Sequence, residues 1–274
     1  MTMVSINTNV GAIFAANSSY QTTKSMETSM ARLSSGKRIN SAADDAAGIQ
    51  IATRMETEIR GLNQAVRNAA DGQALLMTTE GALDEVHTIL LRIRELAVQS
   101  SNGTYSLHDR VALQAEVTDL QSEITRISED TTWSGKNLLD GTLSAGISFQ
   151  IGADNGQTMT ISIGNHALDE LSLGANTISS AVSAMAYISI VDAAISIIST
   201  NRGRYAAAIN RLDHAIANMQ NIATNLSQSK GRIEDADFAA ETANLARVQV
   251  LQQASMAMLA QANASKQNIL SLFQ

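Results

Sequence analysis

The chain has 274 residues, a formal net charge of −7, and neither cysteine nor proline. Without cysteine, no disulfide framework or thiolate metal site can form, and the acidic balance argues against nucleic acid bound through a basic face. Because proline breaks helix interiors, its absence permits very long helices. Hydrophobic residues make up 45% of the chain but aromatic residues only 3%. Small and branched apolar side chains of this kind suit helices that pack side by side.

The N-terminal segment carries almost no charge. Between Met1 and Ala31 only Lys24 and Glu27 are ionised. Its start, MTMVSINTNVGAIFAANSS, lacks a basic region followed by a long apolar core, so we expect no cleaved Sec-type leader. The chain also lacks a run of about 18 consecutive apolar residues, so we expect no membrane span.

Three later segments show the periodicity of coiled coils. The first is predicted over about residues 42–100 and opens at a capping box of Ser41 and Asp44. The second opens at Ser106 and Asp109, after a turn signal at 101–103. Apolar residues step by four and three along all three segments: Ala82, Val86, Ile89, Ile93 and Leu96; Leu113, Val117, Leu120, Ile124 and Ile127; Tyr205, Ile209, Leu212, Ile216, Met219, Ala223 and Leu226. Three such stripes predict an intramolecular antiparallel coiled-coil bundle.

Between the second and third of these segments, the apolar period changes to two. Two short runs alternate in this way: Ile147, Phe149 and Ile151; Met159, Ile161 and Ile163. The turn signal Asp154-Asn155-Gly156 lies between them, so a β-hairpin is predicted over 147–163. The predicted fold class is therefore mainly α, a long helical bundle with a small β-hairpin region.

The C-terminal segment is as poor in charge as the N-terminal one. Between Val248 and Gln274 only Lys266 is charged. On a helical wheel its apolar residues spread over more than one face: Leu245, Val248, Val250, Leu251, Met256, Met258 and Leu259. A helix that is apolar on several sides is expected to be buried on several sides. Because the two ends of one chain can cover each other only partly, the pattern predicts assembly with other copies.

No arrangement of residues favours catalysis. The four histidines (His87, His108, His166 and His214) are scattered, and no His-Glu-x-x-His motif occurs. Asp84 and His87 lie three residues apart and could share a metal ion, but a solvated helix face is the more ordinary interpretation. We predict neither an enzyme nor a metal or cofactor site.

Three stretches, taken together, are similar to bacterial flagellins. The first comprises SINTN at 5–9 and LSSGKRINSAADDAAG at 33–48, and the second is RIRELAVQS at 92–100. The third comprises RIEDADF at 232–238, LQQA at 251–254, LAQAN at 259–263 and LSLF at 270–273. The chain departs from the common pattern at Ala43 (commonly Lys), Leu91 (commonly Gln) and Lys266 (often Pro).

The resemblance implies a domain organisation and a function. Residues 1–44 and 232–274 would pair as an inner helical domain, D0, while 45–178 and 179–231 would form a surrounding domain, D1. The chain would then be an extracellular structural subunit of the flagellar filament, used for motility. A hook–filament junction protein of the same superfamily is the nearest alternative, and a cytosolic coiled-coil adaptor a more distant one.

The resemblance and the apolar faces together predict which residues carry contacts. The expected polymerisation interface comprises Ile6, Val10, Phe14, Leu33, Leu245, Val248, Leu251, Met256, Leu259, Leu270, Leu272 and Phe273. Arg92, Leu96 and Glu116 match positions at which D1 domains touch, and at which the vertebrate innate receptor TLR5 binds family members. Ser and Thr residues within 142–183 are candidates for O-glycosylation. The other implied partners are copies of the chain, the flagellar export apparatus, a flagellin chaperone, the filament cap and hook-associated proteins, with no nucleic acid or membrane.

Overall fold

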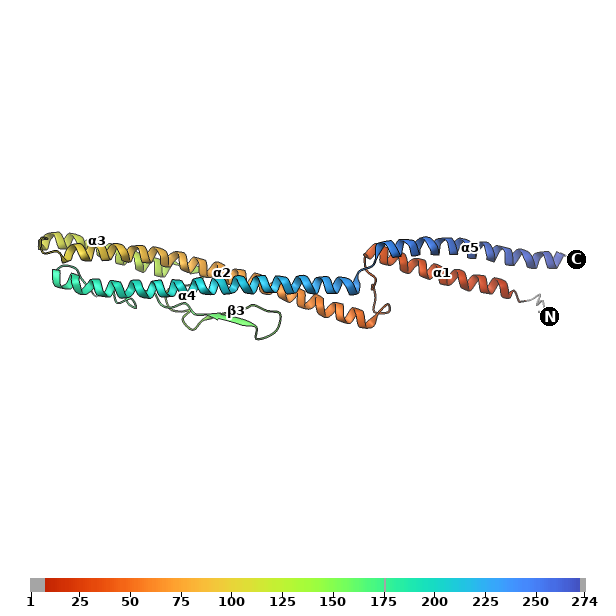
Figure 1. Cartoon of the computed structure of the whole chain (residues 1–274), viewed down its shortest axis with the longest axis horizontal. Helices are drawn as coiled ribbons and strands as arrows, with labels where there is room; N and C mark the ends of the chain where they lie inside the picture. The colour runs from red at the N-terminus through yellow and green to blue at the C-terminus, as the bar shows by residue number, and fades with distance from the viewer. Residues whose placement is uncertain (1–7, 175, 272–274) are drawn as a thin grey trace. The chain divides into compact units, whose positions relative to one another are not determined.

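A computed structural model describes the backbone of residues 8–174 and 176–271 and the side chains of 8–174 and 176–265. The chain divides into two compact units: Met1–Thr57 with Asn225–Gln274, and Glu58–Thr224. The elements, labelled in Figure 1 where space allows, are α1 (Val10–Ser35), α2 (Ala46–Ser101), α3 (Leu107–Asp130), β1 (Thr132–Trp133), β2 (Lys136–Asn137), β3 (Ile147–Gln150), β4 (Thr158–Ile161), α4 (Ala181–Glu234) and α5 (Phe238–Ser271).

The unit 58–224, here called the bundle, has a continuous apolar core. Along α2 the buried residues recur at the predicted spacings of three and four, and Val86, Ile93 and Leu96 of the predicted stripe are buried. Ala82 and Ile89 of that stripe are half-buried, and their neighbours Leu83 and Leu90 are fully buried instead. The α4 stripe follows the same rule: Ala184, Tyr187, Val191, Ala194, Ile198, Tyr205, Ala208, Leu212, Met219 and Ala223. Such heptads keep one face of each helix against its neighbours. The predicted mainly α bundle is confirmed.

Polar contacts set the direction of each helix in the bundle. Gln73 bonds Asp213, Arg202 bonds Glu80 and Arg94 bonds Asp192, so α2 and α4 are antiparallel. By contrast, α3 and α4 run in the same direction, since Gln114 accepts from Ile178 N and Gln121 donates to the Tyr187 hydroxyl. The connection 131–180 returns along the bundle and makes this parallel pairing possible.

That connection contains two small hairpins. The predicted one is present: β3 pairs antiparallel with β4, with Ile147 opposite Ile161 and Phe149 opposite Met159. Gly156 has a φ of 85° at its turn, as the turn signal requires. The second hairpin, β1–β2, turns at Ser134 and Gly135, and both residues have positive φ. Apolar residues of the connection complete the core: Leu138, Leu139, Ile163, Leu171, Leu173 and Ile178.

The entry to α2 differs from the prediction. Asp44 does not cap the helix; its Oδ2 accepts from the backbone N–H groups of Asn40 and Ser41 and from the Ser41 hydroxyl, closing a turn. The helix begins at Ala46, and Asp45 Oδ1 accepts from Gly48 N at 2.8 Å. The sequence offered two adjacent aspartates, and the second has the capping geometry because the first closes the turn. The capping box of Ser106 and Asp109 is confirmed.

The apolar composition of helix α4 can be compared with the expectation of no membrane span. It contains an 18-residue window long and apolar enough to cross a membrane by composition, and 28% of that window is buried. The chain has no run of about 18 consecutive apolar residues, but the average hydropathy of this window is high enough to meet the criterion for a span. Composition alone is weak evidence, because the core helix of a bundle has the same apolar content. The absence of a membrane partner stays a prediction.

Candidate assembly surface

In the unit formed by 1–57 and 225–274, α1 and α5 lie side by side and antiparallel (Figure 1). Asn9 caps α1, accepting from Ala12 N at 3.1 Å, while its amide donates to the Ala262 carbonyl at 3.1 Å. Further contacts follow in descending order along α5: Ser18–Ser255, Thr23–Gln252, Ser29–Asn244 and Arg32–Glu241. The seam is thus built largely from small and polar side chains, which bring the helices together but bury little apolar surface.

Backbone hydrogen bonds connect the segment that follows α1 to the segment that precedes α5. Gly36, with a φ of 70°, ends α1, and its carbonyl accepts from Ala236 N at 2.9 Å. Arg38 N donates to the Glu234 carbonyl, and Asp237 then caps α5 by accepting from Ala239 N and Ala240 N. The predicted boundaries at 44/45 and 231/232 fall near these breaks, whereas the compact units divide at 57/58 and 224/225, inside α2 and α4. The four-part domain division stays a prediction.

The structure explains why the motif at 33–48 ends in a glycine, Gly48. A Cβ at this position would lie 2.6 Å from Ile39 Cδ1 and 2.4 Å from Asp45 Oδ2. Ile39 is buried, at 3% exposure, so it has little room to move away. The glycine therefore allows Ile39 to pack and Asp45 to cap the same turn.

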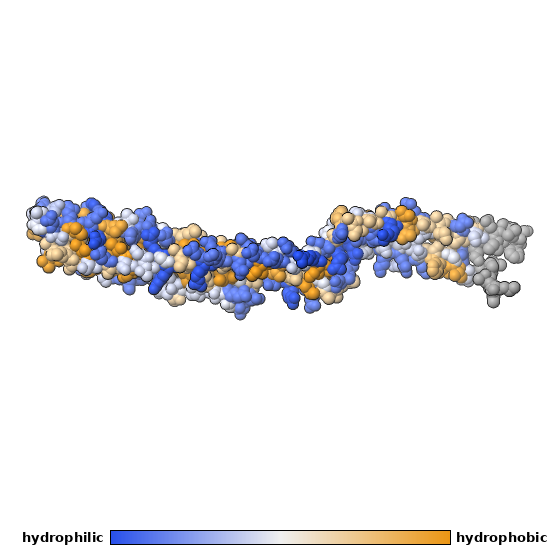
Figure 2. Space-filling view, viewed as in Figure 1, coloured by the Kyte–Doolittle hydropathy of each residue, from blue (hydrophilic) through white to orange (hydrophobic). Residues whose placement is uncertain are grey.

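Large apolar side chains cover the outside of the α1–α5 pair. Those exposed are Val10, Ile13, Phe14, Tyr20, Met30, Phe238, Val250, Leu251, Met256 and Met258. Figure 2 shows apolar residues on the visible face of this pair. Full burial of one such side chain contributes roughly 1.5–3 kcal/mol, and exposed apolar patches of this kind mark interaction sites. The surface is suited to contact with further protein.

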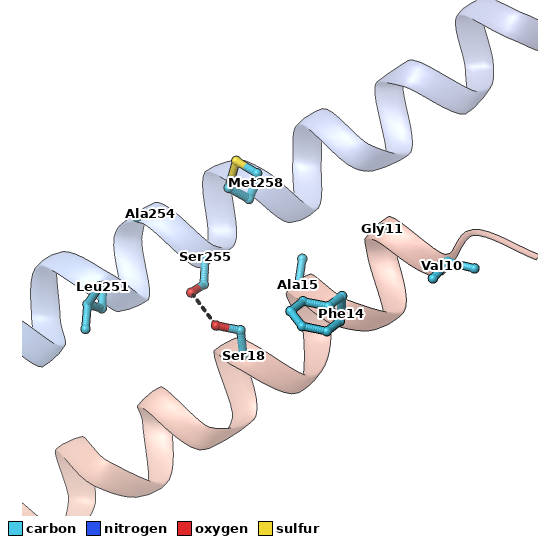
Figure 3. Close-up of a pocket in the computed structure, with 9 residues that line it drawn as sticks. All are labelled: Val10, Gly11, Phe14, Ala15, Ser18, Leu251, Ala254, Ser255 and Met258. Atoms are coloured by element: carbon cyan, nitrogen blue, oxygen red, sulfur yellow. Dashed lines mark hydrogen bonds between the residues drawn. The ribbon is translucent and has the colours of Figure 1, made fainter. Parts of the chain in front are cut away.

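A groove interrupts this surface between the two helices. It has a volume of about 510 Å³ and lies between Gly11, Phe14 and Ala15 on one side and Leu251 and Met258 on the other (Figure 3). Small residues line its floor, and Gly11 approaches the Ala262 Cβ closely enough that an added Cβ would lie 3.8 Å away. The groove has the size and apolar character to accept a large apolar side chain.

The predicted interface residues fall into several classes. Val10, Phe14, Leu251 and Met256 are exposed, and Leu33, Leu245 and Leu259 are half-buried. Val248 is only 6% exposed and lies in the seam of the pair, so it offers no surface to another copy. The side chains of Ile6, Leu270, Leu272 and Phe273 lie outside the described residues.

A second predicted contact site lies in the bundle. The Arg92 guanidinium donates to Glu116 at 2.9 Å and to Glu95 at 3.1 Å, and both members of the Arg92–Glu116 pair are about half exposed. The hydrogen bond with Glu116 is the main cause that raises the pKa of Arg92. Leu96, by contrast, is 1% exposed in the bundle core. Arg92 and Glu116 can present a surface to a partner, whereas Leu96 supports that surface from beneath.

Sequence reasoning missed the small residues of the groove. Gly11, Ala15 and Ser18 recur at steps of four and three on α1, opposite Ala254 and Ser255 on α5. The signal was present as a stripe of small residues at helical spacing. The stripe points to close helix pairing, but it does not reveal which apolar residues stay outside.

Asp84 is also explained by the structure. Its carboxylate pairs with Arg202 at 2.8 Å. Within the described residues no group of three or more metal-ligating side chains comes together. The geometry thus supports an ion pair between α2 and α4 at this position.

A coiled-coil bundle joined to a helix pair with an uncovered apolar face defines a class of self-associating structural subunits. Comparisons with known proteins agree. Residues 6–144 match the bacterial flagellin N-terminal helical region, and residues 188–273 match the bacterial flagellin C-terminal helical region. The chain belongs to the bacterial flagellin family.

Individual relatives are similar over nearly the whole chain. A flagellin of Halalkalibacterium halodurans is 41% identical, with 98% of this chain and 99% of the relative covered. Flagellin D of Vibrio anguillarum is 34% identical with the same coverage, but that alignment spans 374 positions against the 274 residues of this chain. The crystal structure of Bacillus cereus flagellin matches 60% of this chain and 94% of its own, with 33% identity and a TM-score of 0.51.

These findings identify the chain as an extracellular structural subunit of the flagellar filament, in a family whose members serve motility. The longer alignment with the Vibrio relative means that this chain lacks sequence which that relative carries. In this chain, α3 and α4 are connected by residues 131–180, whose described part contains only the two small hairpins β1–β2 and β3–β4.

Proposed function

We propose that the exposed apolar surface of α1 and α5 is the polymerisation interface, and that it is covered by the same surface of neighbouring copies. One observation carries this proposal: ten large apolar side chains of the pair are exposed while its seam is mostly polar. Contacts that repeat from copy to copy without closing produce an open helical tube rather than a ring. The bundle would supply lateral contacts, including those of Arg92 and Glu116.

Seeded assembly of the purified monomer tests this function. Long tubes of uniform diameter in negative-stain electron microscopy are expected when the monomer is added to flagellin seeds. Failure to elongate, with the helix content intact by circular dichroism, would contradict the proposal. That outcome would favour a hook–filament junction protein or a coiled-coil adaptor.

The remaining partners follow from the same proposal. An uncovered apolar helix pair needs protection before assembly, which supports transient binding by a flagellin chaperone and delivery by the flagellar export apparatus without cleavage of a leader. At the two ends of a filament the same surface would contact the cap and the hook-associated proteins. A complex of the monomer with a flagellin chaperone, weakened by Leu251→Ala, is the expected result in a binding assay.

Arg92 and Glu116 are the observation that favours a second role. Their half-exposed ion pair forms a charged patch on the α2–α3 face, suited to recognition by TLR5. Receptor activation by the monomer should fall when Arg92 is replaced in Arg92→Ala, and an undiminished response would contradict this role. Replacing Arg126, an exposed arginine of α3 in similar ion pairs, by Arg126→Ala provides the matched control.

We also propose O-glycosylation within 142–183, because hydroxyl-bearing side chains of this segment are exposed to solvent. Several hydroxyl-bearing residues of this segment are exposed: Thr142, Ser144, Ser148, Thr158, Thr160, Ser162, Ser172, Thr177 and Ser180. The intact mass of native protein should exceed that of the bare sequence by whole sugar units. A mass equal to the bare sequence would exclude modification.

A further inference from the structure

A polar groove in the bundle is lined by two arginines that have no hydrogen-bond or ion-pair partner within the described part of the chain. It has a volume of about 240 Å³ and lies between α4, which supplies Arg204 and Arg211, and the chain around β4, which supplies Thr160 and Ser162. Its floor includes Tyr205, which is 3% exposed and accepts from Gly164 N at 3.3 Å. The floor is therefore fixed, while the two arginine side chains are exposed.

These arginines differ from the others of the bundle. Arg92, Arg94, Arg126 and Arg202 form ion pairs, Arg67 bonds Gln64 and Arg110 donates to backbone carbonyls. Arg60 also has a partner. Among the arginines in the described part of 58–224, only Arg204 and Arg211 form neither a hydrogen bond nor an ion pair. Both face the same groove.

Their spacing on α4 suits a shared ligand. Residues seven apart lie on one face of a helix, about 10.5 Å apart along its axis. Two guanidinium groups at that separation can approach the groove from either end, with Ser144 and Ser162 hydroxyls on the opposite wall. Guanidinium groups bind carboxylates through paired N–H donors, so a carboxylate is the chemistry that this groove fits.

The charge balance of the molecule indicates where that carboxylate comes from. In a chain of net charge −7, two unpaired arginines stand among an excess of acidic residues. The bundle also exposes acidic residues that no described basic side chain pairs, including Asp119, Glu129 and Glu170. In a polymer of identical chains such groups are held at high local concentration, and opposite charges on different copies set the register of contact.

We propose that the Arg204–Arg211 groove binds an acidic side chain of a second copy of this chain. This inference rests on the proposed function, because it assigns a contact between assembled subunits. It places that contact in the bundle, on α4 and β4, separate from the apolar surface of α1 and α5.

Two measurements test the groove. The double variant Arg204→Gln with Arg211→Gln should raise the critical monomer concentration for seeded assembly roughly tenfold, with a weaker dependence on salt than the unmodified chain. The control, Arg67→Gln with Arg126→Gln, makes the same change in charge at arginines that already bond within their own helices. It should assemble like the unmodified chain. Equal critical concentrations for both double variants would overturn the inference.

Cross-linking identifies the partner group directly. Filaments of the variant Arg204→Lys with Arg211→Lys, built from mixed isotope-labelled and unlabelled chains, are treated with a carbodiimide that joins an amine to a touching carboxylate. Links from position 204 or 211 to an aspartate or glutamate of another copy are expected in filaments and not in monomers. Filaments with no such intermolecular link would overturn the inference.

Other outcomes separate the two proposals. If the monomer binds inorganic sulfate in this groove while the double variant assembles normally, the groove is a small-anion site and the inference is wrong. If the unmodified chain fails to elongate, the proposed function is overturned and this inference with it. Normal elongation by every variant overturns this inference alone.

Discussion

In the bundle, residues such as Leu83, Leu90 and Ile93 are fully buried. Among the described side chains of the α1–α5 pair, ten large apolar ones are exposed and only Ser29 and Val248 are buried. Both regions consist of long helices with similar amounts of Ala, Leu, Ile and Met. They differ in how many neighbours each helix has within the chain. A helix in the bundle contacts two others and a connecting loop, while each helix of the pair has one partner.

This difference indicates how stability is distributed. Burial of apolar surface must offset the loss of conformational entropy on folding. A single helix–helix seam buries too little apolar surface to offset that cost by itself. The bundle can meet that cost within one chain. Under the proposed function, the pair would meet it only when other copies cover its outer face, so that folding of the pair and assembly would be coupled.

The largest effect that tests this division is loss of α5. Deleting residues 248–274 removes one wall of the apolar groove and most of the exposed surface of α5. Seeded assembly should be abolished, because the neighbouring copies lose their contact surface. Far-UV circular dichroism should still show the helices of the bundle. Filaments formed by the truncated chain would show that the bundle alone is enough.

A substitution in the bundle core should lower the stability of the monomer, whereas loss of α5 should lower assembly. Leu90→Ala leaves a cavity at a fully buried position, and such changes cost about 2–5 kcal/mol. Urea unfolding of the monomer should report this loss in the bundle. The control Leu251→Ala removes a leucine that is 49% exposed and should change monomer unfolding by much less. Equal losses for the two variants would mean that the pair is as well packed as the bundle.

Phe14 gives a smaller and more local test. Its ring is 78% exposed beside the groove, so Phe14→Ala removes little that the monomer buries. In the filament the ring would be covered, and its loss should raise the critical concentration by roughly tenfold, or about 1.4 kcal/mol. The measurement is seeded assembly with a monomer melt as the reference. An unchanged critical concentration would remove Phe14 from the interface.

The sequence predicted the parts of the fold that depend on local pattern. Heptad stripes located the bundle helices, and alternation around Asp154-Asn155-Gly156 located the hairpin β3–β4. The entry to α2 was less predictable because Asp44 and Asp45 offer the same capping chemistry. In the structure Asp44 closes the preceding turn, and Asp45 is the one that accepts from Gly48 N. The periodicity also could not give the parallel α3–α4 pairing, which depends on the path of 131–180.

The candidate site was predicted less completely than the fold. Low charge on both ends predicted an assembly surface there, yet it could not tell Val248, which is buried against α1, from Leu251, which is exposed. The two positions are three residues apart, and which of them is buried depends on how the two helices meet. Leu96 belongs both to the predicted apolar stripe and to the predicted contact site, and its 1% exposure agrees with the stripe.

His166 offers the smallest effect and shows how tightly the connection 131–180 is held to the bundle. Its ring is fully buried, with Nε2 2.9 Å from Asn201 Nδ2, the Tyr205 ring set edge-on at 6.5 Å, and its backbone N–H bonded to the Leu139 carbonyl. Burial is the main cause that lowers the pKa of His166 below its ordinary value of 6.5. The unfolded chain therefore binds a proton more readily than the folded one.

The sign of the pH effect follows from that lowered pKa. The contribution of neutral His166 to stability is fully present above pH 6.5 and is lost as the pH falls below it, at most about 1.4 kcal/mol per pH unit. In His166→Gln this part of the pH dependence between pH 7.5 and 5 should disappear, whatever the absolute stability of the variant. His214→Gln, which removes an exposed histidine of α4, should keep it. An unchanged pH slope in His166→Gln would mean that the connection opens enough in the native bundle for the ring to take up a proton, so that the bundle would resemble the α1–α5 pair more than its packing indicates.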